Sequence, residues 1–206
     1  IEQGARVRSF TRCGKALEGH EIEVRDEAGH VLPDLQVGRF FFRGPSVMEG
    51  YYGRPEETDA VLSADGWLNT NDLGYLRDGE IVIVGRAKDL IIINGRNIWP
   101  QDIEWSAERE IEQLRTGDVS AFSIDDPEGE KIVVLAQCRT KDESARDALR
   151  AEVAAVLSSA HGVRCEVVLV PHNSLPFTTS GKLSRTKSKQ MFLDGSLRDV
   201  SAPTDE

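Results

Sequence analysis

Residues 176–185 read PFTTSGKLSR, and this stretch carries the strongest local signal in the chain. A proline, three hydroxyl side chains and a glycine come directly before a single lysine, Lys182. Gly181 permits a positive φ or a close backbone approach, and the hydroxyls can satisfy backbone groups or contact phosphate oxygens. The stretch therefore predicts a loop that presents one cation. A solvated turn before a short helix is the alternative for the same residues.

The composition describes an ordinary soluble globular protein, with 206 residues, 39% hydrophobic and 29% charged. The net charge of −10 argues against a general nucleic-acid or anionic-membrane binder. Cysteines 13, 138 and 165 are far apart and odd in number, which is typical of reduced thiols in a cytoplasmic protein. No apolar run is long enough to cross a membrane, and the scattered histidines predict no metal site.

Residues 1–85 read as short strands separated by turns. Residues 21–25 alternate between charged and apolar side chains, and residues 38–44 contain an apolar run between two glycines, so both are expected to be strands. Asp78-Gly79 predicts a hairpin turn before a strand at 80–85. This region is therefore predicted to be a small β-barrel-like subdomain.

From residue 86 the pattern becomes mixed α and β, so the fold class is predicted as α+β. Helices are expected from residue 100 to about 114 and over 143–160, and the acids of 104–112 are expected to be one solvated helix face. Strands are expected at 90–93, 119–124, 131–138 and 163–170. The mixed domain is expected to cover 86–195, and the tail, 196–206, to be disordered.

Four stretches occur together in one order: GPSVMEGYYGRPEET at 44–58, Asp72 within NTNDLG at 69–74, GRAKDLIIINGRNIWPQDIE at 85–104, and the lysine stretch at 176–185. They resemble C-terminal motifs of the adenylate-forming superfamily, which includes acyl-CoA synthetases, luciferases and adenylation domains of peptide synthetases. GRNIWPQDIE is most similar to the fatty acyl-AMP ligase branch. Most acyl-CoA synthetases carry a Gly-Gly-Glu type sequence where this chain has Asn94-Gly95-Arg96.

The resemblance implies a role for each matching residue. Lys182 matches the catalytic lysine, Asp72 the ribose-binding aspartate and Arg86 an arginine that contacts the nucleotide. An Asx turn at Asp72 is the plain alternative. Lys88 and Asp89 fall at the hinge, although they could equally form a surface ion pair of little energy. Gly95 and Arg96 match the loop that lines the thiol passage, and a simple turn glycine is the alternative there.

The resemblance also implies the role of the whole chain. Residues 1–85 would be the last β subdomain of an N-terminal adenylation core, and 86–195 a mobile C-terminal lid. The expected cofactors are ATP and Mg²⁺, bound mainly by an N-terminal portion outside this chain, so the chain alone is expected to be inactive. The expected partners are a fatty acid, that N-terminal portion and an acyl carrier protein of polyketide biosynthesis, with no nucleic acid and no membrane span.

Two alternatives to this function stay open. One is a CoA-forming acyl-CoA synthetase, and the other is a non-catalytic module that binds a carrier protein. Carrier proteins are usually acidic, so docking on this acidic chain needs a basic patch, for which the sequence offers Arg185, Lys187 and Lys189.

Overall fold

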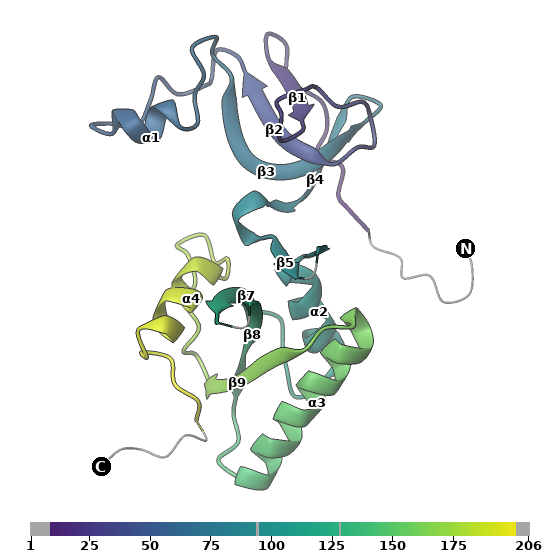
Figure 1. Cartoon of the computed structure of the whole chain (residues 1–206), viewed down its shortest axis with the longest axis vertical. Coiled ribbons are helices and arrows are strands. Elements are labelled where there is room, and N and C mark those ends of the chain that lie inside the picture. The colour runs from purple at the N-terminus through teal and green to yellow at the C-terminus, as the bar shows by residue number, and fades with distance from the viewer. Residues whose placement is uncertain (1–8, 94, 128, 201–206) are drawn as a thin grey trace, which may run out of the picture. The chain divides into compact units, whose positions relative to one another are not determined.

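The computed structural model describes residues 9–93, 95–127 and 129–200 (Figure 1). The chain divides into two compact units, which we call unit 1 (Ile1–Lys88) and unit 2 (Asp89–Glu206). The sequence predicted a boundary after residue 85, and the division in the structure follows Lys88. The mixed helix and sheet composition confirms the predicted α+β class.

Unit 1 is built on one antiparallel sheet of four strands in the order β1-β2-β3-β4. The elements are β1 (Glu21–Arg25), β2 (Gly38–Arg43), the short helix α1 (Pro55–Asp59), β3 (Leu68–Arg77) and β4 (Glu80–Arg86). Strands β1 and β4 lie at opposite ends of this order, so the sheet is open. The barrel-like closure expected from the sequence is therefore wrong for the described part of unit 1.

The free edge of β4 has another partner. Ile81 of this strand accepts a backbone hydrogen bond from Cys13 and donates one to Gly14, each 2.8 Å long. An isolated bridge joins Arg12 to Val82 beside them. Because this segment uses the backbone groups that β1 would need, the sheet cannot close there.

Gly74 shapes the long strand β3. The pairing of β3 with β4 shifts register between Leu73 and Gly74. A Cβ atom at Gly74 would collide with the carbonyl oxygen of Val82 and with the Phe40 ring. Glycine is therefore required where β3 bulges, two residues after Asp72.

The described residues of unit 2 form a small hairpin, a three-stranded sheet and three α-helices. After the 3-10 turn η1 (Ala87–Asp89) come β5 (Ile91–Ile93), β6 (Arg96–Ile98), α2 (Pro100–Glu110), β7 (Val119–Asp126), β8 (Gly129–Cys138), α3 (Glu143–His161), β9 (Cys165–Pro171) and α4 (Arg185–Leu193). The larger sheet has the order β7-β8-β9, with β7 and β8 antiparallel and β8 and β9 parallel. Helix α3 makes the crossover that a parallel pair requires.

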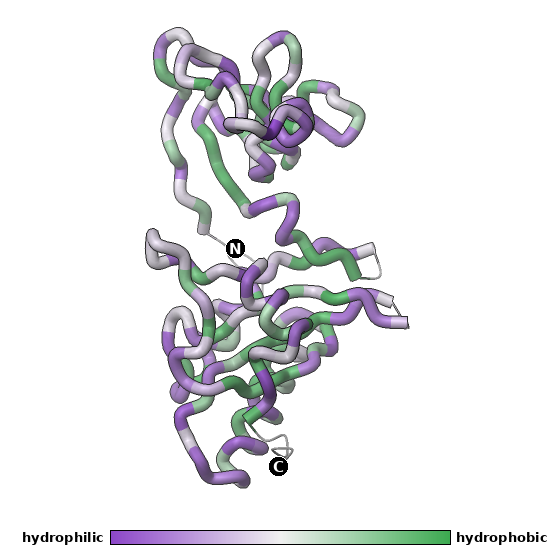
Figure 2. The backbone as a smooth tube through the Cα atoms, turned by 90° about the vertical axis from the view of Figure 1, so that its left-hand side faces the viewer, coloured by the Kyte–Doolittle hydropathy of each residue, from purple (hydrophilic) through white to green (hydrophobic). Residues whose placement is uncertain are grey.

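Helices pack on both faces of this sheet. Alternate residues of β8 belong to different apolar clusters, because successive strand side chains point to opposite faces. Ile132, Val134 and Ala136 pack in the cluster that contains the apolar residues of α2 and α3. Val133 and Leu135 pack in the cluster against α4. Figure 2 accordingly shows hydrophobic stretches of the backbone, in green, within unit 2.

The ends of helix α3 agree with its sequence. Asp142 caps the N-terminus by accepting a 2.7 Å hydrogen bond from the Ala145 amide. Gly162 ends the helix with a φ of 65°, the left-handed conformation that favours glycine. The helix predicted over 143–160 is thus fixed by local capping as well as by its apolar stripe.

Residues 196–200 are packed, so the prediction of a disordered tail is wrong for them. Leu197 is only 4% exposed. The Val200 amide donates to the Leu169 carbonyl over 2.8 Å, and Arg150 donates to both carboxylate oxygens of Asp199. The prediction relied on the polar composition of residues 196–206, which does not reveal partners that are distant in the sequence. Residues 201–206 lie outside the described residues.

No helix in the described ranges combines the length and the apolar character that crossing a membrane requires.

Candidate functional site

The stretch that carries Lys182 forms a tight hairpin in unit 2. Phe177 and Leu183 form an isolated antiparallel bridge at its base. Within it, the Thr178 amide donates to the Lys182 carbonyl over 2.8 Å, and the Lys182 amide donates to Oγ1 of Thr178 over 3.1 Å. Gly181 has a φ of +77°, as its turn position requires. The backbone of Lys182 is therefore fixed by its own loop.

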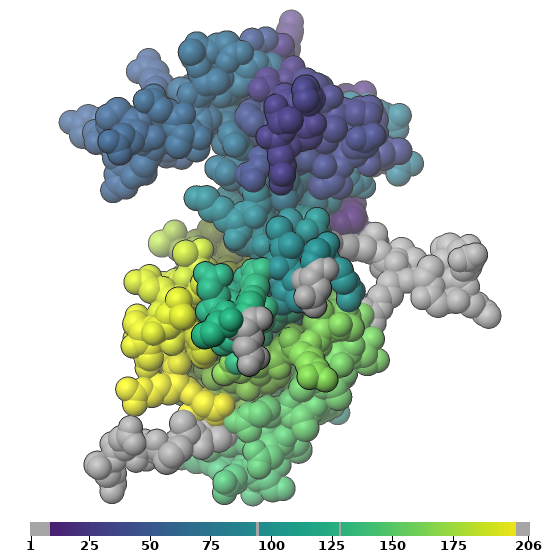
Figure 3. Space-filling model, in the orientation of Figure 1, coloured from purple at the N-terminus to yellow at the C-terminus, as the bar shows by residue number. Residues whose placement is uncertain are grey.

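The side chain of Lys182 is directed to solvent. The residue is exposed, and the ion pairs of the described residues do not include its ammonium group. The loop thus presents a cation that no acid in the described part of the chain neutralises. Helix α4, which begins three residues later, forms part of the surface of unit 2 in Figure 3.

Arg185, the first residue of α4, makes a partly buried network with two acids. Its guanidinium donates to both carboxylate oxygens of Glu104, over 2.8 and 2.7 Å, and to Oδ2 of Asp89 over 2.9 Å. Only 20% of the Arg185 side chain and 6% of that of Glu104 is exposed. Arg185 is therefore not part of an open basic patch, which corrects the prediction made for it. Lys187 is exposed.

Two acids of α2 face the sheet. Oε1 of Glu104 accepts from the Ala121 amide over 3.0 Å, and Oε1 of Glu108 accepts from the amides of Gly117 and Val119. These carboxylates thus bind backbone donors along the start of β7. Burial raises the pKa of both Glu104 and Glu108, and the bonds from Arg185 oppose that rise at Glu104. The expectation of one solvated acidic face is wrong for these two residues.

A signal for this network was present in the sequence. Ile103 and Ala107 of α2 and Ile111 directly after it are buried at a spacing of four residues. Glu104 and Glu108 follow the first two of these residues directly. Adjacent positions on a helix are rotated by about 100°, so these acids border the core. The prediction of a solvated helix face considered only the charge of these acids and not their position beside the buried stripe.

Asp72 and Arg86, the predicted nucleotide contacts, lie opposite each other in unit 1. They are register partners on β3 and β4. Nε of Arg86 lies 3.3 Å from Oδ1 of Asp72, and the arginine side chain is 70% exposed. The Asp72 amide donates to Oγ1 of Thr70 over 3.1 Å, so this turn bond is made by the Thr70 side chain. It is not the Asx turn considered as an alternative, which would need the Asp72 carboxylate to accept a backbone amide. The structure therefore brings together two of the predicted site residues.

The predicted hinge residues lie where the two units divide. Lys88 is exposed and ends unit 1, and Asp89 begins unit 2. Both belong to η1. Asp89 pairs with Arg185, so the surface ion pair considered between Lys88 and Asp89 is not the contact that the structure shows.

Gly95 and Arg96 lie at the turn of the β5–β6 hairpin in unit 2. Gly95 has a φ of +72°, whereas Asn94 lies outside the described residues. The Arg96 guanidinium donates to the His161 carbonyl at the end of α3 over 3.0 Å. This bond ties the hairpin to a helix C-terminus, where a cation is favourable.

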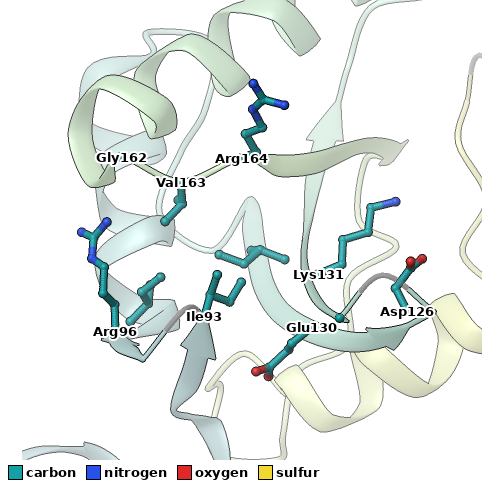
Figure 4. Close-up of a pocket in the computed structure, with 11 residues that line it drawn as sticks. Ile93, Arg96, Asp126, Glu130, Lys131, Gly162, Val163 and Arg164 are labelled. Carbon is teal, nitrogen blue, oxygen red and sulfur yellow. The ribbon is translucent and has the colours of Figure 1, made fainter.

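A hollow of about 500 Å³ lies beside this hairpin (Figure 4). Its lining includes the apolar residues Ile93, Ile98, Ile132 and Val163, together with charged residues of both signs. Two of its cations are already engaged, because Arg96 binds the end of α3 and Lys131 pairs with Glu166 over 2.6 Å. The mixed charge of the lining therefore does not indicate whether a ligand of this hollow would be an anion or a cation.

The described residues contain no group of three or more His, Cys, Asp or Glu side chains placed to hold a metal ion.

Comparison with known proteins finds relatives that are named as acyl-CoA synthetases or fatty-acid–AMP ligases. It is 56% identical over 198 residues to a Caulobacter vibrioides protein named "Putative acyl-CoA synthetase", covering 96% of this chain and 35% of the relative. It is 34% identical to the long-chain-fatty-acid–AMP ligase FadD32 of Mycolicibacterium smegmatis, covering 86% of this chain and 34% of the relative. No family model matches the chain. The chain thus spans about a third of the length of these curated relatives.

Solved structures with the same fold agree. One, from a study of fatty acyl-adenylate ligases of E. coli and L. pneumophila, has a TM-score of 0.82 at 43% identity and covers 95% of this chain and 34% of its own. Another is McyG A-PCP complexed with phenylalanyl-adenylate, with a TM-score of 0.82, 29% identity, and coverage of 95% of this chain and 35% of its own. The chain belongs to the adenylate-forming superfamily and corresponds to about a third of a member.

Proposed function

We propose that this chain is the C-terminal part of a fatty acyl-AMP ligase, which activates a fatty acid with ATP and passes the acyl group to an acyl carrier protein. The order of the four motifs and the relatives named as fatty-acid–AMP ligases support this proposal. The observation that carries it is Lys182, an exposed ammonium group on a hairpin of fixed backbone.

In the proposed reaction, an oxygen of the fatty acid carboxylate forms a bond to the α-phosphorus of ATP. The bond from that phosphorus to the pyrophosphate oxygen breaks, and pyrophosphate leaves. Both reactants are anions, so a cation at the reacting centre lowers the barrier. A unit-charge pair about 4 Å apart is worth about 4 kcal/mol at an effective dielectric of 20. Felt only in the transition state, this corresponds to roughly three decades of rate.

The other predicted residues would bind the nucleotide and let the lysine move. Asp72 would accept hydrogen bonds from the ribose hydroxyls through Oδ2, since Arg86 lies against Oδ1. Arg86 is exposed enough to contact the nucleotide as well. Unit 1 would be the last β subdomain of the adenylation core, and unit 2 a lid that rotates about Lys88 and Asp89. ATP and Mg²⁺ would be bound mainly by segments that these 206 residues do not include.

The acyl acceptor separates this proposal from its main alternative. The relative at 56% identity is named as an acyl-CoA synthetase, which favours CoA as the acceptor. The GRNIWPQDIE sequence, with Arg96 after Gly95, favours a carrier protein. In either case, Gly95 and Arg96 would line the passage for the pantetheine thiol.

The test uses a chimeric ligase in which this chain replaces the matching third of the Caulobacter vibrioides relative. We expect the chimera to release pyrophosphate from ATP and a long-chain fatty acid, and the isolated chain to release none. With preformed acyl-AMP, the chimera should acylate a holo acyl carrier protein faster than it acylates CoA. Faster acylation of CoA would establish the alternative. Binding of a carrier protein without pyrophosphate release would point to a non-catalytic module.

A further inference from the structure

Arg185 joins three segments of the unit 2 backbone. It follows the lysine hairpin directly and begins α4. Glu104, which accepts two of its hydrogen bonds, lies on α2 and is itself tied to β7 through the Ala121 amide. Asp89, which accepts the third, is the first residue of unit 2. One guanidinium therefore connects the base of the hairpin, the scaffold helix and the residue that follows Lys88.

The geometry of these contacts makes them rigid. The two bonds to Glu104 run from Nε and a terminal nitrogen to the two carboxylate oxygens, a bidentate arrangement that fixes orientation as well as distance. The exposed fractions of the three side chains are between 6% and 20%, so water screens the pairs weakly. Such a network resists displacement far more than an exposed pair does.

Other contacts support the hairpin from its sides. The Ser184 amide donates to the Pro176 carbonyl over 2.9 Å, and Leu183 packs against the apolar cluster under α4. The Phe177 ring lies over Gly117, where a Cβ atom would approach it to 3.1 Å. Gly117 in turn donates its amide to Glu108. The hairpin is thus seated on the connection between α2 and β7.

We propose that Arg185 is a positioning residue for Lys182, and that it sets the place of the lysine hairpin relative to α2 and to Asp89. This inference rests on the catalytic role proposed for Lys182. Arg185 does not contact substrate in this proposal. Through the bond to Asp89, a rotation at Lys88 would carry the hairpin along with the start of unit 2. A displacement of a reacting group by about 1 Å can cost on the order of 100-fold in rate, which gives the expected size of the effect.

The test compares variants of the chimeric ligase in both half-reactions. Arg185→Gln should lower kcat for pyrophosphate release about 100-fold and leave the KM for ATP within about twofold. Its transfer of preformed acyl-AMP should stay within about twofold of the parent, because that step does not use Lys182. Arg185→Lys keeps the charge but cannot span both oxygens of Glu104, so we expect an intermediate rate. Arg198→Gln alters an exposed arginine of the same unit and should have the parent rate.

A double variant shows whether Arg185 acts through Lys182. If it does, Arg185→Gln combined with Lys182→Ala should be no more than about twofold slower than Lys182→Ala alone, because residues that act as a unit are not additive. Losses that multiply would overturn the inference. Equal losses in both half-reactions, accompanied by a lower Tm, would also overturn it, since they indicate a purely structural role.

Three further outcomes keep the test decisive. If Arg185→Gln does not fold, the test uses Asp89→Asn instead, because this variant leaves both Arg185 bonds to Glu104 in place. We expect Asp89→Asn to lower the rate of pyrophosphate release about tenfold. A parent rate for this variant would overturn the inference. If Lys182→Ala itself has the parent rate, the proposed function fails whatever Arg185 does. If Lys182→Ala is slow and Arg185→Gln is not, only the positioning role is lost.

Discussion

The two arginine–carboxylate sites of this chain use the same groups in opposite ways. In unit 1, Arg86 touches Asp72 through a single contact of 3.3 Å and keeps 70% of its side chain exposed. In unit 2, Arg185 makes three hydrogen bonds to Glu104 and Asp89 and is 20% exposed. An exposed, loose pair costs little to separate and is available to a ligand. A buried, bidentate pair fixes the backbone segments that carry it.

The largest difference between the sites should appear in stability. Glu104→Ala removes the acceptors of two of the three Arg185 hydrogen bonds and leaves that guanidinium partly buried. It also removes the acceptor of the Ala121 amide. We expect the free energy of unfolding of unit 2 to fall by about 3–5 kcal/mol, as when one partner of a buried pair is removed. Hydrogen exchange of the β7 and β8 amides in the 206-residue chain measures this loss.

The matched control is Glu112→Ala, which removes an exposed acid shortly after α2 and should change stability by less than about 0.5 kcal/mol. If Glu104→Ala and Glu112→Ala lowered the free energy of unfolding equally, the distinction between a buried, paired acid and an exposed acid would be wrong.

The Asp72–Arg86 pair, in which the arginine is 70% exposed and the aspartate 27%, should matter for ligand binding and little for folding. Asp72→Asn in the chimeric ligase should raise the KM for ATP about tenfold, because a carboxylate is a stronger acceptor for ribose hydroxyls than an amide. The stability of unit 1 should change by less than about 1 kcal/mol, as for other surface ion pairs. An unchanged KM together with a large loss of stability would assign Asp72 a structural role instead.

The smallest effect concerns the pH dependence of Glu108. Burial raises its pKa above the ordinary value of 4.5, so the stability that it contributes is fully present below pH 4.5 and is lost as the pH rises through the folded-state pKa. Glu108→Gln keeps an oxygen acceptor for Gly117 and Val119 and does not titrate. The variant should therefore gain stability relative to the parent between pH 4.5 and 7, by less than about 1 kcal/mol. Urea unfolding of both proteins at the two ends of this pH range measures the difference in stability. A relative stability of the variant that increases toward acidic pH would contradict this prediction.

Local patterns in the sequence predicted much of this fold. Helix α3 was predicted within one residue of its end because Leu149, Val153, Val156 and Leu157 form one apolar stripe at helical spacing. The Asp78-Gly79 turn predicted the hairpin between β3 and β4. These features depend on neighbours in the chain, so periodicity and turn chemistry reveal them.

Features that depend on distant partners were missed. The open edge of β4 is covered by residues 12–14, and Leu197 is buried although its surroundings in the sequence are polar. Glu104 and Arg185 are 81 positions apart, so no local signal joins them. The sequence predicted Lys182, Asp72 and Arg86 through their motifs, whereas the contacts that hold the lysine hairpin required the structure.

The central claim is that the lysine hairpin delivers the charge of Lys182 to adenylate formation. The most direct measurement compares Lys182→Ala with Lys187→Ala in the chimeric ligase, for pyrophosphate release and for transfer of preformed acyl-AMP separately. We predict that Lys182→Ala lowers the rate of pyrophosphate release by about three decades and leaves transfer nearly unchanged, while Lys187→Ala keeps the parent rate of pyrophosphate release. Equal losses of Lys182→Ala in both half-reactions, or a parent rate of pyrophosphate release, would contradict this account.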